Sequence, residues 1–269
     1  MLWGYTNLSK HLGPDQPVFA FNSRGLNGQD EFASIEEMAA QYVADLRAFH
    51  PDQPYFLGGY CFGGDIAYEM ARQLEAQGEK VALLALMNCA PPNSSYARIR
   101  WTPLFTLKFL RNLCQIAADA LHGTRRQKLV FFRWATRSLQ KKINRLITWR
   151  RAGAQQAEIE KLIVDAEEAL ELPPDARPLW NIHLHALIAY HPKSYHGKVA
   201  LFRSRSHPPL CSFDPLCGWG ELATGGVTVT TVPGSHENIL DEPHVRAVAK
   251  ALKENLDKIH GASETDDKL

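Results

Sequence analysis

The sequence predicts an α/β fold with a mostly parallel sheet, helices on both faces and an inserted helical lid. The uninterrupted apolar run Val81–Met87 is typical of a strand buried on both faces of a parallel sheet. The apolar residues 55–57 lead, through a glycine-rich turn, into the helical spacing of residues 65–74. Between residues 94 and 177 the strand signal disappears and helical spacing takes over, for a length that exceeds an ordinary connection.

These patterns divide the 269 residues into three parts. We expect residues 1–93 and 178–261 to form the α/β core, residues 94–177 to form the lid and residues 262–269 to be a disordered tail. A chain of this length with 45% hydrophobic residues can bury a large single core that carries an insertion.

The first fifty residues predict two helices with a strand between them. The first helix starts near Leu2, shows helical spacing up to Leu12 and should end at Gly13. Residues 17–21 predict a short strand. Ser34, with Glu37 three residues later, is a capping box that opens a second helix.

The last ninety residues return to the α/β pattern. Residues 199–202 and Val227–Val232 are predicted strands, and a final helix should run from about Pro243 to Ile259.

Cys61 occupies the centre of Gly58-Gly59-Tyr60-Cys61-Phe62-Gly63-Gly64. A strand that turns sharply into a helix at such a motif presents one reactive side chain, and glycines flank it because Cβ atoms would not fit. We therefore interpret the motif as a nucleophile elbow with Cys61 as the nucleophile. The alternative is a glycine-rich turn that merely buries a small thiol.

His236 follows the last predicted strand directly. In α/β-hydrolases the nucleophile, the third triad member and the histidine occur in this chain order. We therefore predict that His236 is the general base, although most of the eleven histidines should be ordinary surface residues.

Composition excludes several other functions. The net charge of +1 indicates no particular partner, and the five scattered cysteines show neither a disulfide framework nor metal-ligand spacing, so we expect a reducing, cytoplasmic location and no bound metal. The N-terminus lacks a signal peptide, and no apolar run is long enough to span a membrane.

The chain resembles the thioesterase domains that terminate nonribosomal peptide and polyketide synthases. The resemblance rests on several stretches that cover most of the chain outside the lid: residues 12–18, 24–26, 58–64, 90–92, 218–219 and 233–236. It implies an α/β-hydrolase fold and an acyl or peptidyl substrate presented on the phosphopantetheine arm of a carrier protein. No bound cofactor is implied, and release is to water or to an internal amine or hydroxyl.

Two positions depart from the family pattern of a serine nucleophile and an aspartate after the strand that here ends at Met87. The chain has Cys61 and Asn88 there. A serine needs the aspartate to stabilise the imidazolium, whereas a cysteine beside a histidine can already be a thiolate and needs only an orienting hydrogen bond. We therefore predict a triad of Cys61, His236 and Asn88.

Asp214 is the alternative third member, because many α/β-hydrolases place the acid after a later strand. It lies among Pro208, Pro209 and Pro215, where an aspartate commonly caps a turn. We therefore favour Asn88.

The oxyanion hole should use the backbone N–H of Phe62, the residue after the nucleophile. The family's second donor comes from a loop that precedes the first helix, and this sequence lacks that loop. We expect the natural chain to begin upstream of Met1; the alternative is that this protein is a weakened relative that lacks the second donor.

The lid contains ten basic residues and no acidic residue between Arg125 and Arg151. Because carrier domains are commonly acidic, we hypothesise that Arg125, Arg126 and Lys128 steer the carrier; the alternative is a solvated face. No nucleic-acid motif accompanies these charges.

Three functions remain open from the sequence. The first is release of a carrier-bound acyl or peptidyl group through Cys61, by hydrolysis or by cyclisation. The second is a free-standing editing thioesterase, and the third is a catalytically silent carrier-binding module. The sequence does not indicate which acyl group is released or what the oligomeric state is.

Overall fold

The computed structural model describes residues 3–52, 54–97, 100–122, 176–207, 211–236 and 238–266. Within these ranges one sheet contains four strands in the order β1 (Tyr55–Tyr60), β2 (Val81–Met87), β3 (Val199–Ser204) and β4 (Val227–Val232). Each neighbouring pair is parallel. The predicted parallel α/β architecture is confirmed.

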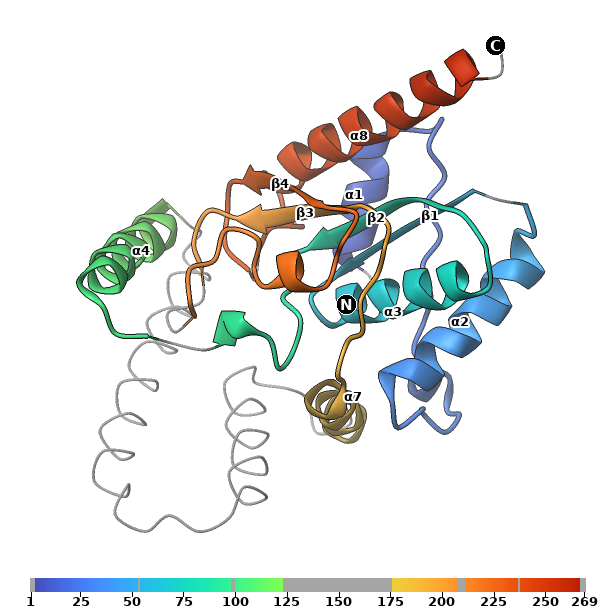
Figure 1. Cartoon of the computed structure of the whole chain (residues 1–269), viewed down its shortest axis with the longest axis horizontal. Helices are drawn as coiled ribbons and strands as arrows, with labels where there is room; N and C mark the ends of the chain where they lie inside the picture. Colours follow the sequence, from blue (N-terminus) through green and yellow to red (C-terminus); the bar gives the residue numbers. More distant parts are fainter. Residues whose placement is uncertain are drawn as a thin grey trace.

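Helices cover both faces of this sheet (Figure 1). One face carries α1 (Trp3–Leu12) and α8 (Val245–Asp266), and the other carries α2 (Ile35–Phe49) and α3 (Phe62–Ala76). Each face has its own cluster of buried apolar side chains, and β2 contributes to both. The all-apolar run of β2 follows from this position, since its two faces both lie against helices.

Local sequence signals set the helix ends. The Ser34 Oγ accepts a hydrogen bond from the Glu37 N–H at 3.2 Å, which confirms the predicted cap of α2. Helix α1 ends at Leu12, and Gly13 follows in a left-handed conformation with φ of 94°. Short 3-10 helices lie at η1 (Arg24–Asn27), η2 (Ser95–Ala97) and η3 (Trp219–Glu221).

The strand predicted at residues 17–21 is wrong. These residues are exposed and pair with no strand in the described ranges. Phe19 packs against Phe49 and Phe21 against Tyr42, with ring centroids 4.7 and 4.8 Å apart. A strand needs a hydrogen-bonding neighbour, and here the segment lies on α2 while β1 forms an edge of the sheet.

Two further boundaries differ from prediction. Strand β3 continues to Ser204, beyond residue 202. Helix α8 continues to Asp266, so residues 262–266 are helical where a disordered tail was expected. The residues in this last turn are compatible with helix, and no proline or glycine follows Gly261 to stop it.

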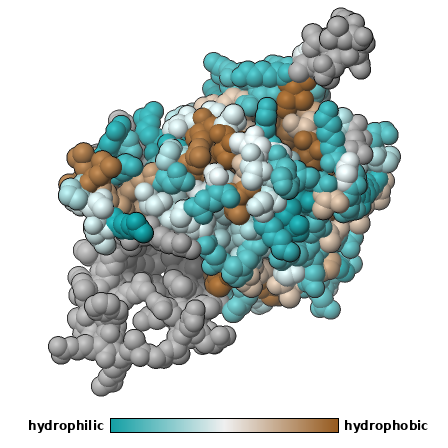
Figure 2. All heavy atoms as spheres, viewed as in Figure 1, coloured by the Kyte–Doolittle hydropathy of each residue, from teal (hydrophilic) through white to brown (hydrophobic). Residues whose placement is uncertain are grey.

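One described helix, α4 (Pro103–His122), lies within the predicted lid, and α7 (Arg177–Ala189) begins where the lid was predicted to end. Residues 123–175 lie outside the described part of the chain, and so does the basic run with it. Helix α4 exposes large apolar side chains, among them Leu104, Leu107 and Leu110. Figure 2 shows hydrophobic surface at the left, on the side where α4 lies in Figure 1. Among the described helices, none is long and apolar enough to cross a membrane.

Candidate functional site

Cys61 lies at the sharp turn between β1 and α3. Its backbone has φ of 52° and ψ of −126°, a conformation that costs a non-glycine residue about 1–3 kcal/mol. The Cys61 N–H donates to the Met87 carbonyl at 3.0 Å, and its own carbonyl accepts from the Gly64 N–H at 2.8 Å. The turn thus joins strand to helix without a connecting loop, as the elbow motif predicts.

The glycines of the motif are required by close backbone approach. A Cβ atom on Gly59 would lie 2.0 Å from the Gly63 carbonyl oxygen. A Cβ atom on Gly64 would lie 2.7 Å from the Cβ of Cys89. Side chains at these positions would force the strand and the helix apart.

Tyr60 connects the elbow to the loop that carries His236. Its hydroxyl donates a hydrogen bond to the His236 carbonyl oxygen, and its ring lies 5.3 Å from the imidazole, centroid to centroid. The residue before Cys61 therefore contacts the predicted general base directly. The fold brings Cys61 and His236 to the same end of the sheet.

The His236 loop is shaped by two neighbours. Gly234 has φ of 101°, and the Asn238 Oδ1 accepts a hydrogen bond from the Ser235 N–H at 2.7 Å. This turn holds His236 immediately beyond the end of β4.

Asn88 lies at the carboxyl end of β2 with φ of 44°. Its Oδ1 accepts a hydrogen bond from the Ser204 N–H at 2.6 Å, and its Nδ2 donates to the Ser235 carbonyl at 3.5 Å. Asn88 therefore ties the end of β3 to the residue before His236. Its amide oxygen has a second lone pair that can accept a hydrogen bond from an imidazole N–H.

Asp214 caps a turn. Its two carboxylate oxygens accept hydrogen bonds from the N–H groups of Leu216 at 3.2 Å and Gly218 at 2.7 Å. The turn contains two left-handed residues, Cys217 and Gly218, which need such support.

Phe62, the first residue of α3, contacts a residue of α7. Its ring stacks on the imidazole of His183 from α7, with centroids 4.8 Å apart. The Nε2 of His183 lies 3.4 Å from Oε2 of Glu31, whose side chain is 1% exposed. Burial lowers the pKa of His183 despite this carboxylate, which favours the neutral imidazole.

A buried carboxyl group lies behind the elbow. Asp65 is 3% exposed, its Oδ1 has no hydrogen-bond partner in the described chain, and its side chain contacts the Cys89 thiol. Burial raises the pKa of Asp65 to about 8, so the carboxyl group is largely protonated at neutral pH. Burial also raises the pKa of the Cys89 thiol, which leaves that thiol unreactive.

Tyr5 holds the end of β1 from the side of α1. Its hydroxyl accepts a hydrogen bond from the Tyr60 N–H at 2.8 Å. Burial raises the pKa of Tyr5, so the phenol keeps its proton. This contact anchors the residue next to Cys61 on the edge of the sheet.

The described residues contain no cluster of three or more metal-binding side chains, and each of the five cysteines is free. Arg125, Arg126 and Lys128, predicted to steer a carrier, lie outside the described residues.

Sequence reasoning missed Tyr5, Tyr60 and His183. Each acts through a partner far away in the chain, and no local spacing signals such a contact. Only the proximity of Tyr60 to Cys61 in the motif could have drawn attention to it.

Comparison with known proteins gives one family. A family profile described as "Thioesterase domain" matches residues 2–256. The chain is 26% identical over 266 residues to the dimodular nonribosomal peptide synthase of Bacillus subtilis (strain 168), covering 96% of this chain and 10% of that protein. It is 26% identical over 264 residues to the inactive atromentin synthetase invA6 of Paxillus involutus, covering 94% and 25%. It spans a quarter or less of these relatives.

A solved structure has the same fold. The NocB thioesterase domain, in covalent complex with a fluorophosphonate nocardicin G analog, superposes with a TM-score of 0.56 at 23% identity, covering 95% of this chain and 89% of that one. The likeness, together with the parallel sheet, shows an α/β-hydrolase fold.

Proposed function

The chain belongs to the thioesterase domain family, and from this premise we propose that it releases acyl or peptidyl groups from a carrier protein through a covalent intermediate on Cys61. The observation that carries the proposal is the strained backbone of Cys61 between β1 and α3. Such strain persists only where the surroundings enforce it, and it presents the thiol at the head of a helix.

The proposed acylation step is attack of the Cys61 sulfur on the thioester carbonyl carbon. His236 takes the proton of the Cys61 thiol. The carbon–sulfur bond to the phosphopantetheine arm breaks, and the leaving thiolate takes that proton from His236. A new thioester joins the acyl group to Cys61. The carrier's free thiol then departs.

The same two residues then release the acyl group, with His236 acting as the base and Cys61 as the leaving group. His236 takes a proton from water, or from an internal amine or hydroxyl of the acyl chain, as that group attacks the acyl-Cys61 carbonyl. The Cys61 thiolate leaves and regains its proton. Hydrolysis gives an acid, and internal attack gives a ring.

The tetrahedral intermediates carry a negative oxygen that needs donors. Phe62 is the first residue of α3, where backbone N–H groups have no partner within the helix and the dipole favours negative charge. We assign its N–H as one oxyanion donor.

Asn88 acts as a positioning residue in this scheme. Its contacts to Ser204 and Ser235 fix the loop that carries His236, and its amide oxygen can orient the ring. Both carboxylate oxygens of Asp214 accept hydrogen bonds within their own turn, which supports Asn88 over Asp214 as the third triad member.

The partner in this proposal is an acyl or peptidyl carrier protein. The substrate arrives on the phosphopantetheine arm, and no cofactor is needed. We assign the reaction to the cytoplasm, where the five free cysteines stay reduced. A free-standing editing role uses the same chemistry.

A catalytically silent carrier-binding module is the second candidate. It is favoured by one observation, the neutral Asn88, whose amide oxygen already accepts the Ser204 N–H at 2.6 Å. In that case Cys61 would not be acylated.

Intact-mass analysis of the protein after incubation with octanoyl-pantetheine tests the proposal. We expect an added octanoyl group on the Cys61 peptide, and its absence in Cys61→Ala. Cys114→Ala, which removes an exposed thiol, is the matched control and should keep the adduct. Turnover that survives in Cys61→Ala would exclude Cys61 as the nucleophile. Absence of both adduct and turnover would favour the silent module.

A further inference from the structure

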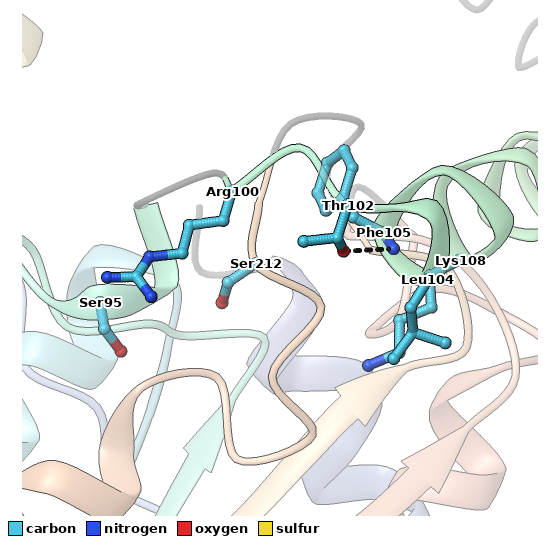
Figure 3. A pocket seen from close by; sticks show the side chains of 7 residues that line it. All are labelled: Ser95, Arg100, Thr102, Leu104, Phe105, Lys108 and Ser212. Atoms are coloured by element: carbon cyan, nitrogen blue, oxygen red, sulfur yellow. Dashed lines mark hydrogen bonds between the residues drawn. The ribbon is translucent and has the colours of Figure 1, made fainter.

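A cavity of about 400 Å³ opens at the N-terminal end of α4 (Figure 3). Its polar lining comes from Ser95, Arg100, Thr102, Lys108 and Ser212. In Figure 3, Ser212 lies between Arg100 and Lys108. None of these side chains has a role in the proposed chemistry of Cys61.

The lining is cationic. Arg100 and Lys108 are the charged residues among those that line the cavity in the described chain. The neighbouring carboxylate of Glu221 accepts a hydrogen bond from the Ser95 hydroxyl. Burial, helped by Arg203 and to a smaller extent by Lys108, lowers the pKa of His207 to about 4, against the opposing effect of Asp214.

The start of α4 adds further donors. The Thr102 Oγ1 accepts the Phe105 N–H at 3.1 Å and caps a helix of 20 residues whose first turn has no acidic side chain. Such a helix end favours an anion. Ser212 also lines the cavity, and its buried Oγ has no hydrogen-bond partner among the described residues.

We propose that this cavity binds the phosphate group of the phosphopantetheine arm. The inference rests on the proposed function, because it assumes a carrier-bound substrate. Two cations, hydroxyl donors and a helix N-terminus together match a tetrahedral anion with several acceptor oxygens. Leu104 and Phe105 border the same cavity and offer apolar surface to the carbon chain next to the phosphate.

The position of the cavity agrees with this assignment. Ser95 lies on the segment that follows β2, seven residues after Asn88. This segment begins at the carboxyl end of the sheet, where Cys61 also lies. The proposal requires the extended arm to reach from the cavity to the elbow.

Calorimetric titration of the whole chain tests the site without relying on turnover. The probes are 4′-phosphopantetheine, pantetheine without phosphate, and inorganic phosphate. We expect 4′-phosphopantetheine to bind at least about tenfold more tightly than either of the other probes, since hydrogen bonds to a charged group contribute that much or more. The difference should shrink at high salt.

The variant Arg100→Ala/Lys108→Ala should remove the preference for 4′-phosphopantetheine and leave pantetheine binding unchanged. Arg111→Ala is the matched control, because it removes an exposed cation of α4 that does not line the cavity. Equal binding of 4′-phosphopantetheine and pantetheine by the unmodified protein would overturn the proposal. So would a preference that survives in the double variant, or inorganic phosphate that binds as tightly as 4′-phosphopantetheine.

Turnover separates this inference from the proposed function. Octanoyl-pantetheine should be hydrolysed equally by the unmodified protein and by Arg100→Ala/Lys108→Ala, whereas octanoyl-phosphopantetheine should lose about tenfold in kcat/KM in the variant. Turnover of both thioesters without a phosphate effect would overturn the phosphate site alone. Phosphate-dependent binding without any turnover would overturn the catalytic proposal alone.

Discussion

The ring of Phe62 stacks on the imidazole of His183, with their centroids 4.8 Å apart and their planes inclined by 23°. Phe62 follows the proposed nucleophile, and His183 belongs to α7, the helix that begins at the end of the predicted insertion. The carboxylate of Glu31 also contacts His183, with Oε2 lying 3.4 Å from Nε2. The contact couples the proposed oxyanion donor to α7.

His183→Ala should remove the stack and leave Glu31 without one of its partners. We expect about 1–2 kcal/mol of lost stability and a rise in KM that exceeds the fall in kcat, because α7 would no longer be held against the elbow. Chemical denaturation and steady-state kinetics with octanoyl-pantetheine measure both effects. His185→Ala, an exposed histidine of the same helix, is the control. Unchanged stability and KM in His183→Ala would contradict the coupling.

Cys61→Ser should lose activity because a serine hydroxyl needs a charged partner behind the histidine. In serine triads the loss of that charge costs about 10⁴ in kcat. We expect Cys61→Ser/Asn88→Asp to recover at least about tenfold over Cys61→Ser. The introduced carboxylate would still accept the Ser204 N–H, although the weak contact with Ser235 would be lost. A double variant no more active than Cys61→Ser would argue against Asn88 as the third triad member.

Asn88→Ala should mainly lower kcat, whereas Asp214→Ala should mainly lower stability. Asn88→Ala removes the contacts to Ser204 and Ser235, so kcat should fall at least about tenfold. Asp214→Ala removes a turn cap and should cost about 1–2 kcal/mol of stability with kcat largely retained. Kinetics and thermal unfolding of both variants decide. A folded but inactive Asp214→Ala, beside a near-normal Asn88→Ala, would reverse the assignment.

Asp65 should make the protein less stable as pH rises. Its pKa is raised from 3.8 to about 8 by burial, so between these values the folded state binds a proton that the unfolded state has lost. The stabilisation from this group is complete below pH 3.8 and is lost as pH rises towards 8. Asp65→Asn should therefore flatten the fall in stability between about pH 5 and 7, by about 1 kcal/mol per pH unit.

Denaturant unfolding at about pH 5, 6 and 7 measures this slope. The exposed carboxylate of Asp45 on α2 offers a matched control, and Asp45→Asn should leave the slope unchanged. An identical slope in the unmodified protein and in Asp65→Asn would contradict the raised pKa.

Patterns local to the chain predicted most of the fold. The apolar run Val81–Met87 predicts a strand that is buried on both faces, and the glycines around Cys61 predict a close approach of two backbone segments. Each of these situations requires particular residue types, so the sequence alone indicates it. Residues 17–21 show the limit of such patterns. Their composition suits a strand, but strand formation depends on a neighbour that local sequence does not specify.

Sequence alone determined the elbow, the parallel sheet, the order of Cys61 and His236 and the family resemblance, because each depends on residues that are close together or in a fixed chain order. The tertiary structure decided how the site is held. Asn88 meets Ser204 across 116 positions, and Tyr60 meets His236 across 176. Such contacts arise only when packing brings distant segments to one end of the sheet, and the phosphate cavity at α4 depends on the same packing.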